Sequence, residues 1–556
     1  MSEKKNTFFG GAAILAVGAV VVKLIGALFK IPMANILGST GNGYFQSAYN
    51  IYGVLLTIST GGLPVALSKQ VSEAHSLGLV NQKKRIFTVA MRTLFIFGLV
   101  CFAVMFFGAR TITATNPGAY CATVALAPAC LFVCCMSALR GYTQGQGIMA
   151  PTAVSQILEA LCKLILGLTL AYVFLHWGAN MTDTFTPLEL AAAGAIAGVT
   201  IGTLVSLVYL SLDRVKRNAR HPEKGTDTPQ SDRAILSRLV KLAVPITLGS
   251  SVVPIVNYLD TIQIQSRLQA VFQMSANAAS DLYGTYGAAV NLYNLPSALM
   301  VPFTASLIPA ISAARARHDL RGATRVTESA MRVAMLLACP MGVGLSALAS
   351  PIVTMLYPKY DAAIMGPILA VLGITSIFTC IVVLSNSILQ ANGFVNLPIV
   401  TMVIGGVLKL VVNYTLVGNP SIGIQGAPVG TLACFGVVGI LDLFIIHRVL
   451  PASPNYMRIF LKPVLCSAVM GLAAWASFGL LSKVLFAMKT FQSVVTVDEV
   501  ETLVLSHMGG AIATLAAIAI AVVVYAVLVL VLHAISKEDL ALMPKGDKIA
   551  KFLRIR

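Results

Sequence analysis

Long apolar segments alternate with short polar ones along almost the whole chain. About fourteen of these segments reach about 20 mostly apolar residues, which at about 1.5 Å per helical residue is enough to cross the hydrocarbon core of a bilayer. The pattern therefore predicts an all-α membrane protein with about 14 transmembrane helices. The predicted spans are 8–31, 44–67, 86–109, 119–139, 151–175, 187–212, 239–262, 283–309, 330–349, 363–389, 397–418, 425–447, 459–482 and 508–534.

The chain repeats itself, because residues of the first six spans recur in the next six at two nearly equal offsets. Gly43, Ala48, Asn50 and Tyr52 recur as Gly284, Ala289, Asn291 and Tyr293, and Gln144, Gly147 and Lys163 recur as Gln390, Gly393 and Lys409. An even number of spans separates the copies, so both run in the same sense. This predicts two six-helix lobes in a pseudo-two-fold arrangement along the membrane normal, with a central site between them.

The polar stretches divide the chain further. We predict an N-lobe at 1–212, a basic cytoplasmic linker at 213–238, a C-lobe at 239–450, and two additional helices with a basic cytoplasmic tail at 451–556. Arg and Lys side chains at an inner membrane surface attract anionic headgroups, each contributing about 1 kcal/mol. Anionic membrane lipids are therefore expected partners of the linker, through the basic residues Arg214, Lys216, Arg217 and Arg220.

Composition and charge agree with a membrane protein. Hydrophobic residues make up 57% of the chain and charged residues only 11%, against about 25% charged in a soluble domain. The net charge of +18 lies in short loops rather than in a stripe with exposed aromatics, which speaks against a nucleic-acid partner. Most cationic loop residues fall on one side, so both termini are expected in the cytoplasm. The outer loops hold Arg110, Arg267, Lys359, Lys483 and Lys489.

Two lysines lie inside the first span. Lys23 and Lys30 are two helical turns apart and therefore share one face. An ammonium group inside a membrane costs several kcal/mol unless it faces a partner or a wet cavity. A cavity with a cationic wall indicates an anionic cargo. The alternative is snorkelling to the surface, which Lys30 could manage more easily than Lys23.

The repeated helices supply five further candidates for substrate binding. Lys163 and Lys409 lie near the middle of equivalent spans, the fifth and the eleventh. Glu159 precedes Lys163 by one turn, so the two could instead form a structural ion pair. Asn50 and Asn291 are candidate polar contacts, or equally hydrogen-bonding links between helices.

The motifs of several enzyme classes are missing from the sequence. There is no phosphate-binding loop of the G-x-x-x-x-G-K-[ST] type, no C-x-x-C pair, and no evident set of paired carboxylates or Ser-His-Asp residues. We therefore expect a transporter rather than an enzyme, with no metal and no cofactor. A coupling ion is possible, and the sequence does not identify one.

The N-terminal pattern resembles the MOP flippase superfamily. The residues that carry the resemblance are Lys23-Leu-Ile-Gly26, Ile36-Leu-Gly38, Gly43-Tyr-Phe, Tyr49-Asn-Ile-Tyr52 and Gly61-Gly-Leu-Pro64. The branch is similar to the polysaccharide-biosynthesis and stage V sporulation protein B group and to the lipid II flippases. The resemblance implies alternating access, a central cationic cavity for the pyrophosphate of an undecaprenyl-linked sugar, and a groove for the lipid tail formed by the two extra helices.

The resemblance also implies a pyrophosphate-contacting role for Lys23. Relatives often carry further arginines in the second and eighth helices, where this chain has Thr57 and Asn291. The expected function is a flippase for lipid II or a related polysaccharide precursor in the cell membrane, with cell-wall synthesis proteins as possible partners. The competing hypotheses are a Na⁺- or H⁺-coupled multidrug exporter of the same superfamily and a membrane-embedded glycosyltransferase.

Overall fold

The fold is nearly all α-helix, as the apolar pattern predicts. The computed structural model describes residues 2–178, 184–220, 225–316, 319–450, 455–497 and 500–534. Among these residues, 12 helices are long and apolar enough to cross a membrane. One of the 12, Val17–Ser76, covers most of the predicted span 8–31 and all of 44–67, and a further helix covers the predicted span 283–309. The all-α membrane fold is confirmed, and the predicted number of about fourteen spans holds approximately.

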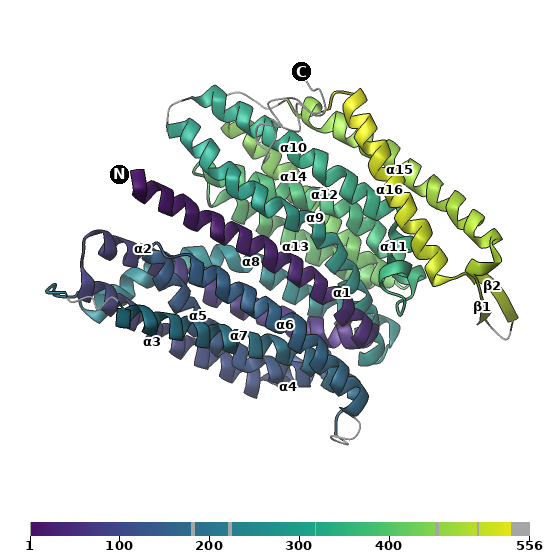
Figure 1. Ribbon diagram of the computed structural model, residues 1–556. Helices are drawn as coiled ribbons and strands as arrows, with labels where there is room; N and C mark the ends of the chain where they lie inside the picture. Colours follow the sequence, from purple (N-terminus) through teal and green to yellow (C-terminus); the bar gives the residue numbers. More distant parts are fainter. Residues whose placement is uncertain are drawn as a thin grey trace. The chain divides into compact units, whose positions relative to one another are not determined.

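The elements follow one another along the chain as in Figure 1. They are α1 (Ser2–Thr60), α2 (Leu63–Ser76), α3 (Val80–Phe107), α4 (Ala109–Ile112), η1 (Pro117–Ala119), α5 (Tyr120–Gly145), α6 (Ala150–Trp177), α7 (Pro187–Arg220), α8 (Asp232–Phe272), α9 (Ala276–Ala316), α10 (Leu320–Ala347), α11 (Ala349–Leu356), α12 (Ala362–Ala391), α13 (Leu397–Val417), η3 (Gly423–Gln425), α14 (Gly426–Val449), α15 (Tyr456–Ala487), η4 (Lys489–Phe491), β1 (Gln492–Val497), β2 (Val500–Leu505) and α16 (His507–Val531).

The chain forms two compact units, Met1–Gly287 and Ala288–Arg556. The first unit holds α1 to α8 and the start of α9, because α8 packs against α1, α2 and α3. The predicted division into lobes at 213–238 stays a prediction. The predicted basic tail lies largely in 535–556, outside the described residues.

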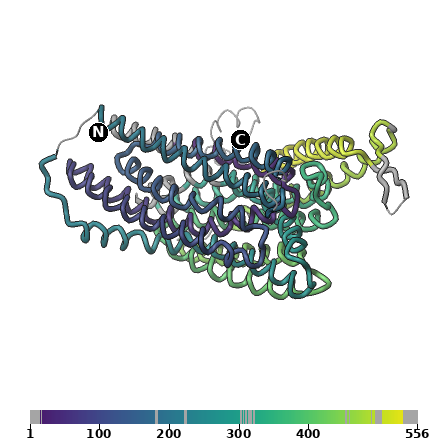
Figure 2. Tube along the Cα trace, turned by 90° about the horizontal axis from the view of Figure 1, so that it is seen from below, coloured from purple at the N-terminus to yellow at the C-terminus, as the bar shows by residue number. Residues whose placement is uncertain are grey.

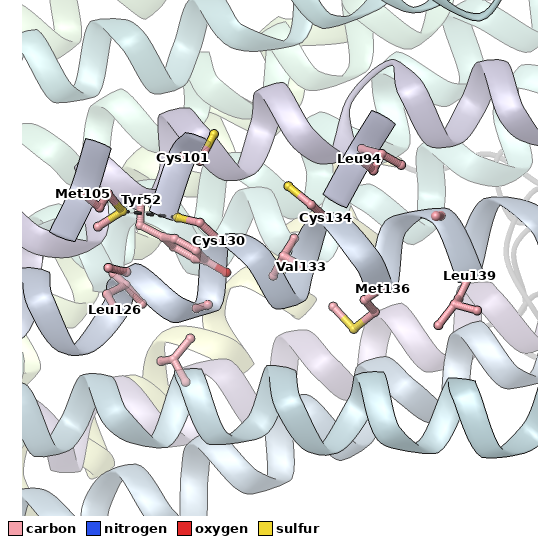
Figure 3. Packing of buried hydrophobic residues seen from close by; sticks show 14 of the residues in the cluster. Tyr52, Leu94, Cys101, Met105, Leu126, Cys130, Val133, Cys134, Met136 and Leu139 are labelled. Carbon is pink, nitrogen blue, oxygen red and sulfur yellow. Dashed lines mark hydrogen bonds between the residues drawn. The ribbon is translucent and has the colours of Figure 1, made fainter. Parts of the chain in front are cut away.

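The first unit is a helical bundle, and most of its long helices are the purple to blue tubes of Figure 2. Helix α5 packs against α1, α2, α3 and α7. Its buried residues are mostly small and include Cys130 and Cys134, which lie among the buried side chains of Figure 3. The Cys134 thiol also donates to the Ser59 hydroxyl on α1 at 3.1 Å. The Cys130 Sγ lies 3.2 Å from the Met105 Sδ on α3. Small residues let helix backbones approach closely, which is how helices associate in a membrane.

Helix α1 contains the first two predicted spans, joined by a kink at Gly38. The predicted spans end at residue 31 and begin again at residue 44, whereas the structure has one long helix across this interval with a single non-helical residue. Gly38 has φ +66° and ψ −175°, a conformation that a residue with a side chain rarely adopts. The chain therefore changes direction at one glycine, without a loop.

The predicted linker is largely helical at both ends, and its described middle is attached to the first unit. Helix α7 continues to Arg220, and α8 begins at Asp232. Between them, the Asp227 carboxylate accepts the backbone N–H groups of Asn81 and Gln82, each at 2.8 Å, at the start of α3. Partial desolvation opposes ionisation, but these backbone donors hold the pKa of Asp227 below its ordinary value. The linker is thus anchored by capping a helix N-terminus.

The second unit joins a bundle of α10, α12, α13 and α14 to the helix pair α15 and α16. These two helices lie side by side, in yellow-green and yellow in Figure 1, and α10 packs against α15. The Tyr525 hydroxyl donates to the Leu336 carbonyl at 2.7 Å, which links α16 to α10. The sequence predicts only a loop between the last two spans, whereas the structure has the antiparallel strands β1 and β2, with Gln492 opposite Leu505.

Candidate functional site

The two lysines predicted inside the first span both lie on α1. Lys23 is exposed and Lys30 is half-buried. Because α1 is helical across this stretch, the two side chains share one face, as their spacing predicts. Lys30 lies close enough to two other cations, Lys163 and Lys23, for their charges to act on it. We call these three residues the lysine cluster.

Lys163 joins the cluster from α6 and is held against aromatic rings of α1. Its Nζ lies 4.8 Å from the ring centroid of Phe29 and 4.6 Å from that of Tyr49. It also donates to the Tyr49 hydroxyl at 3.3 Å. The faces of aromatic rings are electron-rich and stabilise a cation by about 0.5–2 kcal/mol. The ammonium is thus positioned by rings, which leaves its charge uncompensated by these contacts.

Glu159 does not compensate that charge, because its carboxylate pairs with a different residue. Its Oε2 lies 3.1 Å from Nη2 of Arg140, on α5, and the Arg140 Nε donates to the Ser155 hydroxyl at 3.0 Å. The structural ion pair of Glu159 with Lys163 considered from the sequence is therefore replaced by a pair that links α5 to α6. In this geometry the Glu159 carboxylate holds α5 and α6 together.

Asn50 is also engaged in links between helices. Its amide nitrogen donates to the Thr261 hydroxyl and to the Tyr283 hydroxyl, both at 2.9 Å. These partners lie on α8 and at the start of α9, within the first unit. Of the two interpretations of this residue, the hydrogen-bonding link between helices is the one that the contacts support.

The two candidates of the second unit are buried. Lys409 lies on α13 with 5% of its surface exposed, and Asn291 on α9 is also 5% exposed. The Asn291 amide nitrogen makes no hydrogen bond to any residue that the structure describes. These two residues lie in a separate unit from the lysine cluster, and the predicted central site between the lobes stays a prediction.

Asp442, a buried carboxylate in α14, was not among the candidates predicted from the sequence. Asp442 is fully buried, and its Oδ1 accepts from the Thr401 hydroxyl at 2.7 Å. Its Oδ2 has no hydrogen-bond partner among the described residues. An acidic residue inside a predicted span was a usable signal, because such residues are rare in membranes and usually functional. No group of three or more His, Cys, Asp and Glu residues in the described parts could hold a metal ion.

An apolar groove lies in the second unit, between the bundle and the last two helices. Its volume is about 490 Å³, and its walls come from α9, α10, α11, α15 and α16. Leu299, Leu337 and Met470 line it, with Val522 and Tyr525 from α16. Nearly all of this lining is hydrocarbon, so the groove suits an apolar chain rather than a polar solute.

These features define a multi-pass α-helical membrane protein that carries cations within its spans. The profile of the polysaccharide biosynthesis protein family matches residues 8–315, which is more than half of the chain. The chain therefore belongs to this family, as the N-terminal motifs predict.

Curated relatives from Bacillus subtilis (strain 168) match over most of the sequence. The chain is 26% identical to stage V sporulation protein B over 549 residues, covering 97% of this chain and 98% of the relative. It is 27% identical to the lipid II flippase MurJ over 430 residues, covering 73% and 77%. It is 25% identical to the uncharacterized membrane protein YabM over 556 residues, covering 100% and 98%.

Solved structures show the same fold. The lipid II flippase MurJ in an inward closed conformation matches with a TM-score of 0.67 at 15% identity, covering 94% of this chain and 99% of that one. An inward-facing multidrug resistance MATE transporter matches with a TM-score of 0.59 at 13% identity, covering 82% and 98%. The fold is that of MOP-superfamily transporters.

Proposed function

We propose that this protein is a flippase that moves an undecaprenyl-pyrophosphate-linked glycan, lipid II or a related polysaccharide precursor, across the cytoplasmic membrane. Membership of the polysaccharide biosynthesis protein family supports this proposal, as does the similarity to a lipid II flippase and to stage V sporulation protein B. The protein acts by alternating access, as a transporter and not as an enzyme. It is a multi-pass protein of the cell membrane with both termini in the cytoplasm.

The observation that carries the proposal is the lysine cluster. Three ammonium groups at membrane depth on α1 and α6 are costly unless an anion neutralises them. A pyrophosphate offers several oxygens that accept charge-assisted hydrogen bonds. Lys23 is the first contact, because it is exposed, and Lys30 and Lys163 extend the cationic surface beside it. The uncompensated charge of Lys163 is available to the same anion.

The apolar groove supplies the other requirement of a lipid-linked substrate. A polyprenyl tail is hydrocarbon, and the groove between α10 and the last two helices is lined by Leu, Met and Val side chains. Transferring a methylene group out of water contributes about 0.8 kcal/mol. Inside a membrane the gain is smaller, so the groove guides the tail more than it holds it.

A multidrug exporter is the second candidate, favoured by the fold shared with MATE transporters. The charges distinguish the two. A cluster of lysines repels cationic drugs, whereas it attracts a diphosphate. The flippase therefore accounts better for the sign of the charge at the candidate site.

Alanine substitution of the cluster tests the proposal. A charge-assisted hydrogen bond contributes about 1.5–3 kcal/mol, so Lys23→Ala and Lys163→Ala should each weaken substrate binding roughly ten- to a hundred-fold. Lys23→Arg should retain much of the activity, since the charge is kept. The main measurement is translocation of a lipid-linked glycan by the protein reconstituted in vesicles. Dye efflux is measured in the same vesicles, and rescue of growth is measured in a flippase-depleted strain.

Lys69→Ala is the matched control, because Lys69 is an exposed lysine on α2 outside the cluster. Lys409→Ala tests whether the second unit contributes: because Lys409 is buried here, contact with substrate requires a conformation that uncovers it. Unimpaired translocation in Lys23→Ala, Lys163→Ala and Lys409→Ala would remove the cationic-site mechanism. If the unmodified protein exports dye but does not translocate the lipid-linked glycan, the result would favour the multidrug exporter.

A further inference from the structure

A polar cavity lies at one end of the first unit, away from the lysine cluster. Its volume is about 260 Å³, and its walls come from the last turns of α2, α5 and α7. Arg214, Arg217 and Asn218 line it from α7, with His75 from α2 and Gln146 after α5. A water molecule occupies about 30 Å³ in the liquid, so the cavity accommodates a phosphate group together with several waters.

Arg214 is positioned in this cavity by aromatic stacking. Its guanidinium carbon lies 3.4 Å from the ring centroid of Phe87 on α3 and 5.2 Å from that of Tyr142 on α5. Its Nε is buried and makes no hydrogen bond with the described residues. The rings fix the plane of the guanidinium group without using that donor.

Arg217 has unused donors as well. Its Nη2 pairs with the Asp213 carboxylate at 2.6 Å, while Nε and Nη1 are buried without a hydrogen-bond partner in the described parts of the chain. A buried donor without a partner costs about 1–3 kcal/mol. Asp213 offsets one of the two arginine charges, so the cavity keeps a net positive charge and several free N–H groups.

A structural role at the helix end does not account for these donors. Arginines near the C-terminus of a helix stabilise its dipole, but that interaction does not require buried N–H groups that lack hydrogen-bond partners. Lys216 and Arg220 lie on the same helix end and are exposed, outside the cavity. The structure thus separates the four basic residues expected to bind headgroups: Arg214 and Arg217 line the cavity, whereas Lys216 and Arg220 are exposed outside it.

We infer that this cavity is a binding site for a phosphate group, with Arg214 and Arg217 as its main ligands. The group belongs either to an anionic lipid headgroup or to a soluble phosphate compound. Guanidinium N–H groups match the oxygens of a phosphate in geometry and charge, and Asn218 and Gln146 add neutral polar groups. The site is separate from the proposed transport site, and the inference does not depend on the proposed function.

Binding to the purified full-length protein tests the inference in two arms. In detergent, inorganic pyrophosphate is titrated by calorimetry. In the other arm, native mass spectrometry counts retained phosphatidylglycerol against phosphatidylcholine. The variants are Arg217→Gln, which keeps the stacked Arg214, and Asn218→Asp, which places a negative charge at the cavity. Each should weaken binding of the effective probe tenfold or more, while Arg220→Gln and Lys216→Gln, with the same loss of charge outside the cavity, should leave it nearly unchanged.

The two arms distinguish the sources of the phosphate group. Saturable binding of pyrophosphate that Arg217→Gln weakens identifies a soluble ligand of the cavity, and preferential retention of phosphatidylglycerol that the same variant weakens identifies a headgroup. The inference is overturned if neither probe binds, or if Arg220→Gln weakens binding as much as Arg217→Gln does, because the interaction would then follow net charge alone. Thermal unfolding of each variant identifies any that fail to fold, and these are excluded from the comparison.

Discussion

At the scale of single residues, the ionisable groups inside the spans are placed by their neighbours on other helices. The sequence offers Glu159 a partner one turn away, in Lys163. The structure pairs it with Arg140 instead, because an arginine presents several donors and can contact Glu159 and Ser155 together. Sequence spacing finds neighbours within a helix, but it cannot find a partner on an adjacent helix.

This pairing predicts that Glu159 acts on stability rather than on substrate binding. Glu159→Ala leaves the largely buried Arg140 guanidinium without its carboxylate, and breaking such a pair typically costs about 3 kcal/mol or more. We expect the thermal unfolding midpoint of the purified protein to fall clearly. Lys163→Ala, one turn further along the same helix, should lower it much less.

The double variant Arg140→Met/Glu159→Leu serves as the control, since it removes both charges together. It should recover most of the lost stability, because two apolar side chains replace the pair without leaving a charge unpaired. If the Glu159→Ala protein is as stable as the unmodified one, the ion pair does not contribute to the stability of the fold.

At the scale of elements, the apolar pattern predicts the helices well and their ends poorly. The predicted spans coincide with long helices because hydrocarbon thickness sets a minimum apolar length. The kink at Gly38 and the extensions of α7 and α8 beyond the predicted spans were not predictable from hydropathy. Hydropathy indicates neither a change of backbone conformation at one residue nor how far a helix continues past an apolar stretch. The strands β1 and β2 likewise lie outside an apolar span.

One crossing of helices depends on glycines that the repeat analysis singled out. A Cβ on Gly284 would lie 1.8 Å from the Ser39 carbonyl oxygen and 2.6 Å from the Gly43 nitrogen. A Cβ on Gly43 would lie 2.2 Å from the Ser280 carbonyl oxygen. The equivalent glycines of the two repeats thus allow α1 and the start of α9 to touch through their backbones.

We therefore predict that Gly284→Ala and Gly43→Ala each lower the stability of the first unit. Overpacking of this kind costs about 1–3 kcal/mol. The fall should appear in thermal unfolding of the purified protein. Gly53→Ala is the matched control on α1: nothing lies within 4 Å of the added methyl group, so the higher helix propensity of alanine should leave stability equal or higher. A tolerated Gly284→Ala would contradict the close crossing.

At the scale of the whole molecule, the fold and the family were predictable, but the assembly of the site was not. The motifs around Lys23 and Tyr49 lead to the family that the comparison confirms. The pairing of Lys163 with aromatic rings of α1 could not be predicted, because it depends on how α6 packs against α1. The groove likewise needs helices that are distant in sequence, such as α10 and α16.

The orientation of the chain in the membrane stays a prediction and is directly testable. Cationic loops favour the cytoplasmic side, so Thr228→Cys in the linker should react with a membrane-impermeant thiol reagent only from the cytoplasm. Met488→Cys, exposed at the end of α15, should react only from outside. Labelling of intact cells and of inverted vesicles, in a background without the native cysteines, gives the result. Opposite accessibility at either position would reverse the topology.

The border between the two compact units falls within a helix rather than in a loop. It lies between Gly287 and Ala288, inside α9, which is continuous from Ala276 to Ala316. Bending a helix strains a ladder of hydrogen bonds that repeats every turn, and each proline inside the helix removes one of these bonds. Pro296, Pro302 and Pro309 lie in α9 beyond this border, so the part of the helix that belongs to the second unit resists bending less than an uninterrupted helix would.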